Sequence, residues 1–118
     1  MLLVELDSAL RSVDYIAGVY GKTVYDVEDV LCGRCDAGKA LVESPLYPGL
    51  FVISAPYSGG QVAAGALQSF LQQAGGVFDD IVLDTAAGMG APFEAARAAA
   101  SLALICITPD LWPSAMGA

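Results

Sequence analysis

The sequence predicts an α/β fold, a three-layer parallel sheet with helices on both faces. Short apolar runs of strand character alternate along the chain with stretches of helical apolar spacing. This alternation is typical of parallel strands joined by right-handed helical crossovers. Hydrophobic residues make up 56% of the chain, against roughly 45–50% in an average soluble domain. A parallel sheet covered on both faces explains the excess, and so does a fragment whose core continues into further sequence.

The predicted strands are apolar runs bounded by turn or acidic residues. The first starts almost at the N-terminus, the second follows a turn built from Pro45, Pro48 and Gly49, and the third ends at Asp84. The four predicted strands cover residues 2–5, 50–54, 81–83 and 102–108.

The predicted helices rest on apolar spacing and on capping signals. Val24, Val27 and Val30 recur every three residues, with Thr23 as a candidate N-cap and Gly33 as a stop. Asp36 caps the next helix, and Pro92 suits the first turn of the last one. The five predicted helices cover residues 8–17 (a short helix or helical turn), 23–31, 36–43, 61–73 and 92–100.

Length and charge limit the classes of function. With 118 residues, we expect one partial domain over residues 1–118. Five basic residues against 13 acidic ones give a net charge of −8, which disfavours binding to nucleic acid or to anionic lipid. No apolar run has the roughly 18 residues of a membrane span, and no basic leader precedes the N-terminal strand. We therefore expect a cytoplasmic protein without a membrane segment.

The cysteines give a weak signal. Cys32 and Cys35 form a CxxC, and Cys106 lies within the last predicted strand. A structural zinc site needs four ligands, and the chain has no histidine. The CxxC follows a helical stretch rather than a strand, unlike a thioredoxin-type motif. Incidental placement is our interpretation, with redox or metal use as the alternative.

The candidate site residues stand at the ends of two predicted strands. Asp84 ends the third strand, where a carboxylate can bind Mg²⁺ through water, and the backbone N–H of Gly88 can reach a phosphate. Glu5 and Asp7 are two residues apart after the first strand, and paired carboxylates can align a water or a metal. The alternatives are ordinary ones, a helix cap or a turn at each position.

One segment matches the phosphate-binding loop pattern only in part, and we reject it as such a loop. Gly21, Lys22 and Thr23 match the end of the phosphate-binding pattern GxxxxGK[ST], but Ile16 stands where the first glycine belongs. No predicted strand leads into this segment either.

Six segments resemble, in order, the MinD/ParA family of P-loop ATPases with a deviant Walker A motif. They are VELDSALRSVDYIAG (4–18), TVYDVEDVLCGRC (23–35), GKALVE (38–43), LFVISA (50–55), DDIVLDTAAG (79–88) and LALICITPD (102–110). The first resembles the family's switch I pattern D-x-D-x-x-L-R-N-x-D, and DTAAG resembles its switch II pattern D-[ST]-P-A-G. Glu5, Ser12 and Ala86 replace an Asp, an Asn and a Pro of these patterns.

The resemblance implies a partial P-loop NTPase fold and a set of roles. Asp7 is implied to be catalytic by placing the attacking water, Asp84 to be the Mg²⁺-linked residue, and Glu5 and Gly88 to contact the cofactor. ATP and Mg²⁺ are the implied cofactors, and the implied partners are a second copy of the chain and an activating protein. The implied process is placement of the cell-division site.

The family's phosphate loop, with its two lysines, is not found in this sequence. We therefore expect the chain alone to be inactive. In the family, the strand before that loop lies beside the switch II strand, so the sheet should be open next to residues 81–84. A non-catalytic α/β module that binds another protein is the alternative function.

Overall fold

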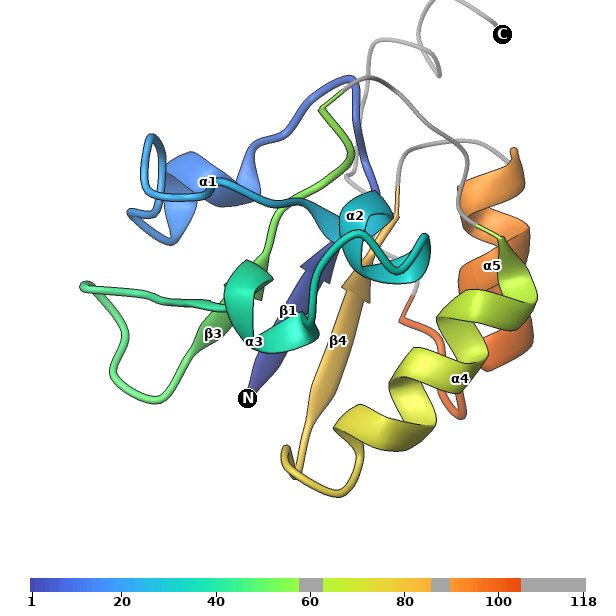
Figure 1. Ribbon diagram of the computed structural model, residues 1–118. Coiled ribbons are helices and arrows are strands. Elements are labelled where there is room, and N and C mark those ends of the chain that lie inside the picture. The colour runs from blue at the N-terminus through green and yellow to red at the C-terminus, as the bar shows by residue number, and fades with distance from the viewer. Residues whose placement is uncertain (58–62, 86–89, 105–118) are drawn as a thin grey trace, which may run out of the picture.

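The computed structural model describes residues 1–57, 63–85 and 90–104. These residues form a mixed sheet with short helices around it (Figure 1). The strands are β1 (Leu2–Glu5), β2 (Val42–Glu43), β3 (Phe51–Ile53) and β4 (Ile81–Asp84). The helices are α1 (Val13–Ile16), α2 (Val27–Leu31), α3 (Ala37–Ala40), α4 (Ala64–Ala74) and α5 (Ala91–Ala99).

The sheet has the order β2-β3-β1-β4. Strand β1 pairs in parallel with both β3 and β4, whereas β2 pairs antiparallel with β3. The predicted parallel arrangement thus holds for the three longer strands, and the short β2 makes the sheet a mixed one. Among the described residues, β4 is an edge strand with β1 as its neighbour, as expected from the family resemblance.

Most predicted elements are found close to their predicted positions. The strands predicted over 2–5, 50–54 and 81–83 are β1, β3 and β4. The helices predicted over 61–73 and 92–100 are α4 and α5, with ends that differ by one to three residues. These are the elements with the strongest local apolar patterns.

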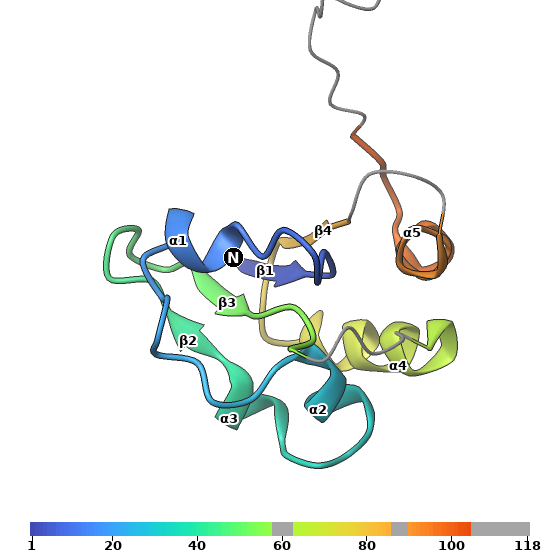
Figure 2. The same ribbon diagram turned by 90° about the horizontal axis from the view of Figure 1, so that it is seen from above.

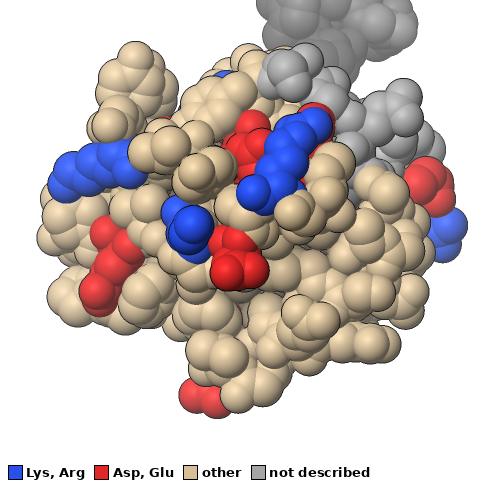
Figure 3. All heavy atoms as spheres, in the orientation of Figure 1, with Lys and Arg blue, Asp and Glu red and all other residues tan. Residues whose placement is uncertain are grey.

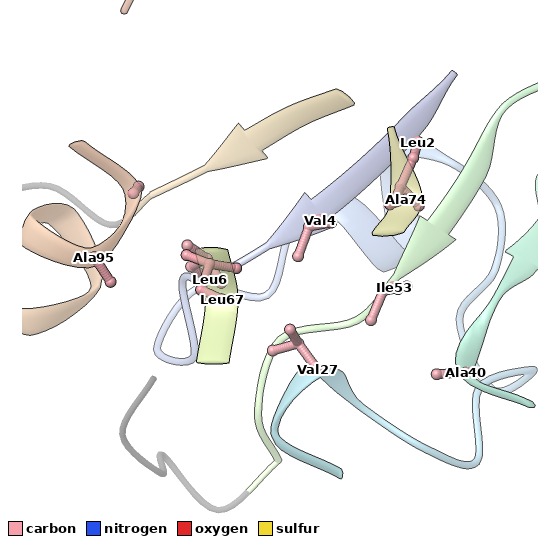
Figure 4. Close-up of a cluster of buried hydrophobic side chains, with 10 residues drawn as sticks. Leu2, Val4, Leu6, Val27, Ala40, Ile53, Leu67, Ala74 and Ala95 are labelled. Carbon is pink, nitrogen blue, oxygen red and sulfur yellow. The ribbon is translucent and has the colours of Figure 1, made fainter. Parts of the chain in front are cut away.

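Helices cover both faces of the sheet, as predicted. Figure 2 shows α1 on one face and α2, α3 and α4 on the other, with α5 beside α4. The side chains of β1 alternate between the faces: Leu2 and Val4 join the larger core, while Leu3 packs against the smaller one. The larger core, drawn in Figure 4, contains Leu2, Val4, Leu6, Val27, Ala40, Ile53, Leu67, Ala74, Ala95 and Ala96. The smaller core contains Val13, Ala17, Val19 and Val52.

Helix α2 starts three residues later than Thr23 would have placed it. Its N-cap is Asp26, whose carboxylate accepts a hydrogen bond from the Asp29 N–H at 3.0 Å. Asp29 reciprocates by accepting from the Asp26 N–H at 2.9 Å, which completes a capping box. Val24 lies outside the helix and is 78% exposed. The prediction of Thr23 as the cap was wrong, whereas Gly33, at φ +77°, follows the helix end as predicted.

The helix predicted over 36–43 is also shorter than expected, because its last residues form β2. Pro45 restricts Ser44 to extended backbone, which is incompatible with a continuing helix. The Ser44 N–H then donates to the Leu50 carbonyl at 2.8 Å, which closes the loop between β2 and β3. Gly49, at φ +82°, supplies the left-handed residue of this loop.

The predicted fourth strand is not found where the chain is described. Residues 102–104 adopt no regular structure, and Leu102 and Leu104 are 77% and 86% exposed. An apolar run becomes a strand only when a neighbouring strand pairs with it, and no described strand does so here. Residues 105–108, including Cys106, lie outside the described residues.

Candidate functional site

The acid-bearing ends of β1 and β4 lie side by side. The two strands pair in parallel with Glu5 opposite Asp84, and the Leu6 N–H donates to the Asp84 carbonyl oxygen at 2.7 Å. Both strands run in the same direction in Figure 1, so their carboxyl ends share one edge of the sheet. Ligands of open α/β sheets bind beyond this edge.

Glu5 is a fully buried acid at this edge, with 0% exposure. Its Oε2 accepts a hydrogen bond from the Val13 N–H, at the start of α1, at 3.2 Å. Its Oε1 is buried and finds no hydrogen-bond partner among the described residues. Burial raises the pKa of Glu5 above its ordinary value. The Val13 N–H opposes this rise in pKa, and the negative charges of Asp14 and Asp84 add to it.

Asp7 and Asp84 interact through their charges. Burial is the main cause of the raised pKa of Asp84, and the negative charge of Asp7 is the second. Asp7 lies on the turn after β1, where its Oδ1 accepts hydrogen bonds from the N–H groups of Ala9 and Leu10 at 3.2 and 3.1 Å. One oxygen of Asp7 therefore serves as a turn cap, the ordinary alternative for this position.

Glu5 and Asp7 lie in different surroundings. Strand β1 ends at Glu5, and Asp7 begins the turn that the Arg11 N–H closes on its carbonyl oxygen. Glu5 is enclosed and Asp7 is partly exposed. The structure brings Glu5 next to Asp84 across the strand pair, and places Asp7 where its charge acts on Asp84.

A partly buried ion pair beside these acids was missed by the sequence analysis. Arg11 donates from Nη2 to Asp14 Oδ2 at 3.2 Å and from Nη1 to the Ala55 carbonyl oxygen. The guanidinium carbon of Arg11 lies 4.0 Å from the centre of the Tyr57 ring. The buried Asp14 also accepts a hydrogen bond from Ser54 Oγ at 2.7 Å. The only local signal was the three-residue spacing of Arg11 and Asp14, which suits an ion pair.

The remaining candidates lie apart from this edge or outside the described chain. Gly88 is outside the described residues. Cys32 is an exposed free thiol and Cys35 is a half-buried one. Where the chain is described, no three His, Cys, Asp or Glu residues are grouped so as to hold a metal ion by themselves. Lys22 is exposed in a turn that precedes α2, which agrees with rejecting the phosphate-loop motif.

The face drawn in Figure 3 shows no concentration of charge of one sign. In Figure 3, acidic and basic side chains are scattered singly or in mixed groups over a mostly uncharged face. Arg34, for example, is paired with Glu28 and Asp29. None of the helices in the described ranges has the length and apolar character needed to cross a membrane.

Comparison with known proteins points to one family. No family model matches the chain. The septum site-determining protein MinD of Synechocystis is 34% identical over 113 residues, which cover 94% of this chain and 42% of that protein. MinD of Bacillus subtilis is 29% identical over 112 residues, with 92% and 42% covered. The chain thus spans about two fifths of the length of these relatives.

Solved structures agree with the sequence comparison. The MinC:MinD cell division protein complex of Aquifex aeolicus matches with a TM-score of 0.70 and 30% identity, over 84% of this chain and 40% of that one. MinD of Pyrococcus horikoshii, solved with Mg-ADP, matches with a TM-score of 0.69 over 83% of this chain and 41% of that one. At 17% identity, the latter match bears on the fold alone.

These comparisons confirm the resemblance to the MinD/ParA family and the P-loop NTPase type of the fold. The sequence matches run through nearly the whole chain, and the matched structures contain MinD proteins of other organisms. This chain is therefore a partial MinD-like sequence, folded as the corresponding part of MinD.

Proposed function

We propose that this chain is the part of a MinD-like ATPase that carries its two switch segments, and that it serves placement of the cell-division site. The observation that carries this proposal is the parallel pairing that sets Glu5 opposite Asp84. It gathers the acids of both switch-like segments at one sheet edge, which is where nucleotide-binding α/β proteins hold their ligand.

The proposed roles follow from the position of each acid. Asp84 would hold Mg²⁺ through water, and Asp7, on the turn beside it, would help to place the water that attacks the terminal phosphate. Mg²⁺ usually takes one or two carboxylates and completes its shell with phosphate oxygens and water, so a cage of protein ligands is not required. The backbone of Gly88 would border the nucleotide, and Glu5, which is enclosed at the same sheet edge, would act through its charge on Asp84. ATP and Mg²⁺ are thus the proposed cofactors.

The 118 residues contain no GxxxxGK[ST] loop, so other sequence would have to supply the main phosphate contacts. The Pyrococcus MinD, which shares this fold, was solved with Mg-ADP, so nucleotide and Mg²⁺ are ligands of a protein with this fold. The MinC:MinD complex supports a protein partner. A second copy of the chain and an activating protein are the further proposed partners, and the cytoplasm is the proposed location.

A complementation experiment tests the proposal. The strand, phosphate loop and first helix of a MinD are joined ahead of this chain, and binding of labelled ATP is measured with and without Mg²⁺. We expect binding that depends on Mg²⁺ and is lost in Asp84→Asn. The matched control is Asp79→Asn, an exposed acid at the opposite end of β4, which should bind as the parent does. Binding that is equal in both variants, or absent from the parent, would refute the proposal.

A non-catalytic protein-interaction module is the second candidate. It is favoured by the replacements at Glu5, Ser12 and Ala86, and by the use of Asp7 Oδ1 as a turn cap. In that case the joined protein would fold but bind no nucleotide, and Asp84→Asn would leave partner binding unchanged.

A further inference from the structure

We propose that Arg11 is a positioning residue, which ties the turn bearing Asp7 to the end of β3 and so fixes where the Asp7 carboxylate lies relative to Asp84. The Asp7 turn comprises residues 7–11, and the Arg11 N–H donates to the Asp7 carbonyl oxygen at 3.1 Å to close it. The contacts of Arg11 are sufficient to argue that it holds the Asp7 turn in place. Its importance for catalysis rests on the function proposed above.

The Arg11 side chain reaches groups in two other parts of the chain, α1 and the segment after β3. It binds Asp14 on α1, the Ala55 carbonyl after β3, and the ring of Tyr57 two residues further on. A planar guanidinium suits this combination, because it donates in two directions while its face lies on an aromatic ring. A lysine at the same place offers one charge without the fork or the flat face.

The groups that Arg11 binds are themselves held by other contacts. Asp14 is 4% exposed, and Ser54 Oγ donates to its second oxygen at 2.7 Å. Tyr57 is held at its backbone, because its N–H donates to the buried Asp26 at 2.8 Å. Arg11 therefore connects the Asp7 turn to groups that are fixed independently of that turn.

The backbone of Arg11 gives a second reason to assign it this role. Its φ is +49°, the one positive value among the described residues other than glycine. Left-handed backbone is unfavourable for a residue with a side chain, and it persists where surrounding contacts enforce it. Glycine would adopt this backbone more easily, so the arginine must be explained by what its side chain holds.

This conflict between backbone and side chain provides a sharp test. In Arg11→Gly the φ of +49° costs less, while all three side-chain contacts are lost. Amide hydrogen exchange is followed by NMR on the 118-residue chain, at Ala9 and Leu10, whose N–H groups bind Asp7 Oδ1, and at Leu3 and Val4 in β1. Arg11→Lys is the conservative variant. Arg34→Met removes an arginine that pairs with Glu28 and Asp29 elsewhere.

We expect Arg11→Gly to speed exchange at Ala9 and Leu10 by about tenfold or more, with β1 unchanged, because the turn loses its anchor. Arg11→Lys should restore part of the protection, and Arg34→Met should leave these sites unaffected. If the exchange rate at Ala9 and Leu10 is unchanged in Arg11→Gly, or rises equally in β1, the positioning role is wrong. Should Arg11→Gly fail to fold, the same comparison in Arg11→Lys decides. No nucleotide enters this experiment, so its outcome is independent of the complementation result.

Discussion

Replacing Glu5 by glutamine should make the fold more stable at neutral pH. Glu5 is 0% exposed, and its Oε1 is buried without a hydrogen-bond partner among the described residues. In Glu5→Gln, the amide oxygen can keep the bond from the Val13 N–H that Oε2 now accepts at 3.2 Å. The amide NH₂ then takes the place of the unpartnered oxygen. It carries no charge, whereas the negative charges of Asp14 and Asp84 oppose ionisation of Glu5.

The pH dependence has a definite sign. The folded pKa of Glu5 is raised above its ordinary value of 4.5, chiefly by burial. A raised carboxyl pKa means that the fold binds the proton more tightly than the unfolded chain does. The contribution of protonated Glu5 to stability is therefore fully present below pH 4.5 and is lost as the pH rises through the folded pKa. The pKa of Asp84 is also raised, by burial and by the charge of Asp7, so its contribution to stability is likewise lost as the pH rises.

The size of the effect follows from two general magnitudes. Each pKa unit between the folded and unfolded states corresponds to about 1.4 kcal/mol at pH values above both. A buried acceptor left without a partner costs about 1–3 kcal/mol. We therefore expect Glu5→Gln to raise the free energy of unfolding at pH 7 by about 1 kcal/mol or more. Near pH 4 the parent Glu5 is protonated, so the difference should largely vanish.

Urea unfolding followed by circular dichroism, at pH values from 4 to 8, measures this difference. The control is Asp79→Asn, which removes the charge of an exposed acid and should change the free energy of unfolding by no more than about 0.5 kcal/mol at any pH. Glu5→Gln could instead prove less stable than the parent at pH 7, or its free energy of unfolding could depend on pH as steeply as the parent's does. Either result would show that ionised Glu5 does not destabilise the fold. The reasoning from burial would then be wrong.

Three further outcomes are expected. Leu67→Ala, at a fully buried position of α4, should lower the free energy of unfolding by about 2–5 kcal/mol in urea, while Leu104→Ala at an exposed one should change it by less than about 0.5 kcal/mol. The double variant Cys32→Ser with Cys35→Ser should melt within a few degrees of the parent, and stoichiometric zinc in the purified protein would contradict this. The 118-residue chain alone should release no phosphate from ATP above a buffer blank, since it lacks the loop that cradles phosphates; turnover that disappears in Asp84→Ala would overturn that expectation.

The fold was predictable where local pattern and tertiary contacts agree. Strands β1, β3 and β4 are apolar runs with clear boundaries, and helices between them require a parallel order. A parallel order also brings the acids at the ends of β1 and β4 to one edge of the sheet. Strand β2 could not be found this way, because its two residues carry too short a pattern.

The start of α2 shows how a distant contact decides a local choice. Thr23 and Asp26 are both acceptable N-caps by residue type. The Asp26 carboxylate, however, also accepts a hydrogen bond from the Tyr57 N–H at 2.8 Å, 31 positions along the chain. The cap at Asp26 thus joins α2 to the segment after β3, and no pattern within residues 23–31 contains that information.

Glu5 and Asp7 show why residue type and spacing alone do not assign roles in a site. Both are acids at the end of one strand, yet Glu5 is enclosed between β4 and α1, while Asp7 lies on the partly exposed turn held by Arg11. A buried acid that lacks a partner for one oxygen weakens the fold at neutral pH, and such costs are concentrated at functional sites. If the proposed function is right, Glu5→Gln should therefore act in opposite directions on two measurements. It should strengthen the fold in urea and weaken Mg²⁺-dependent ATP binding in the joined protein, whereas a purely structural glutamate would change stability alone.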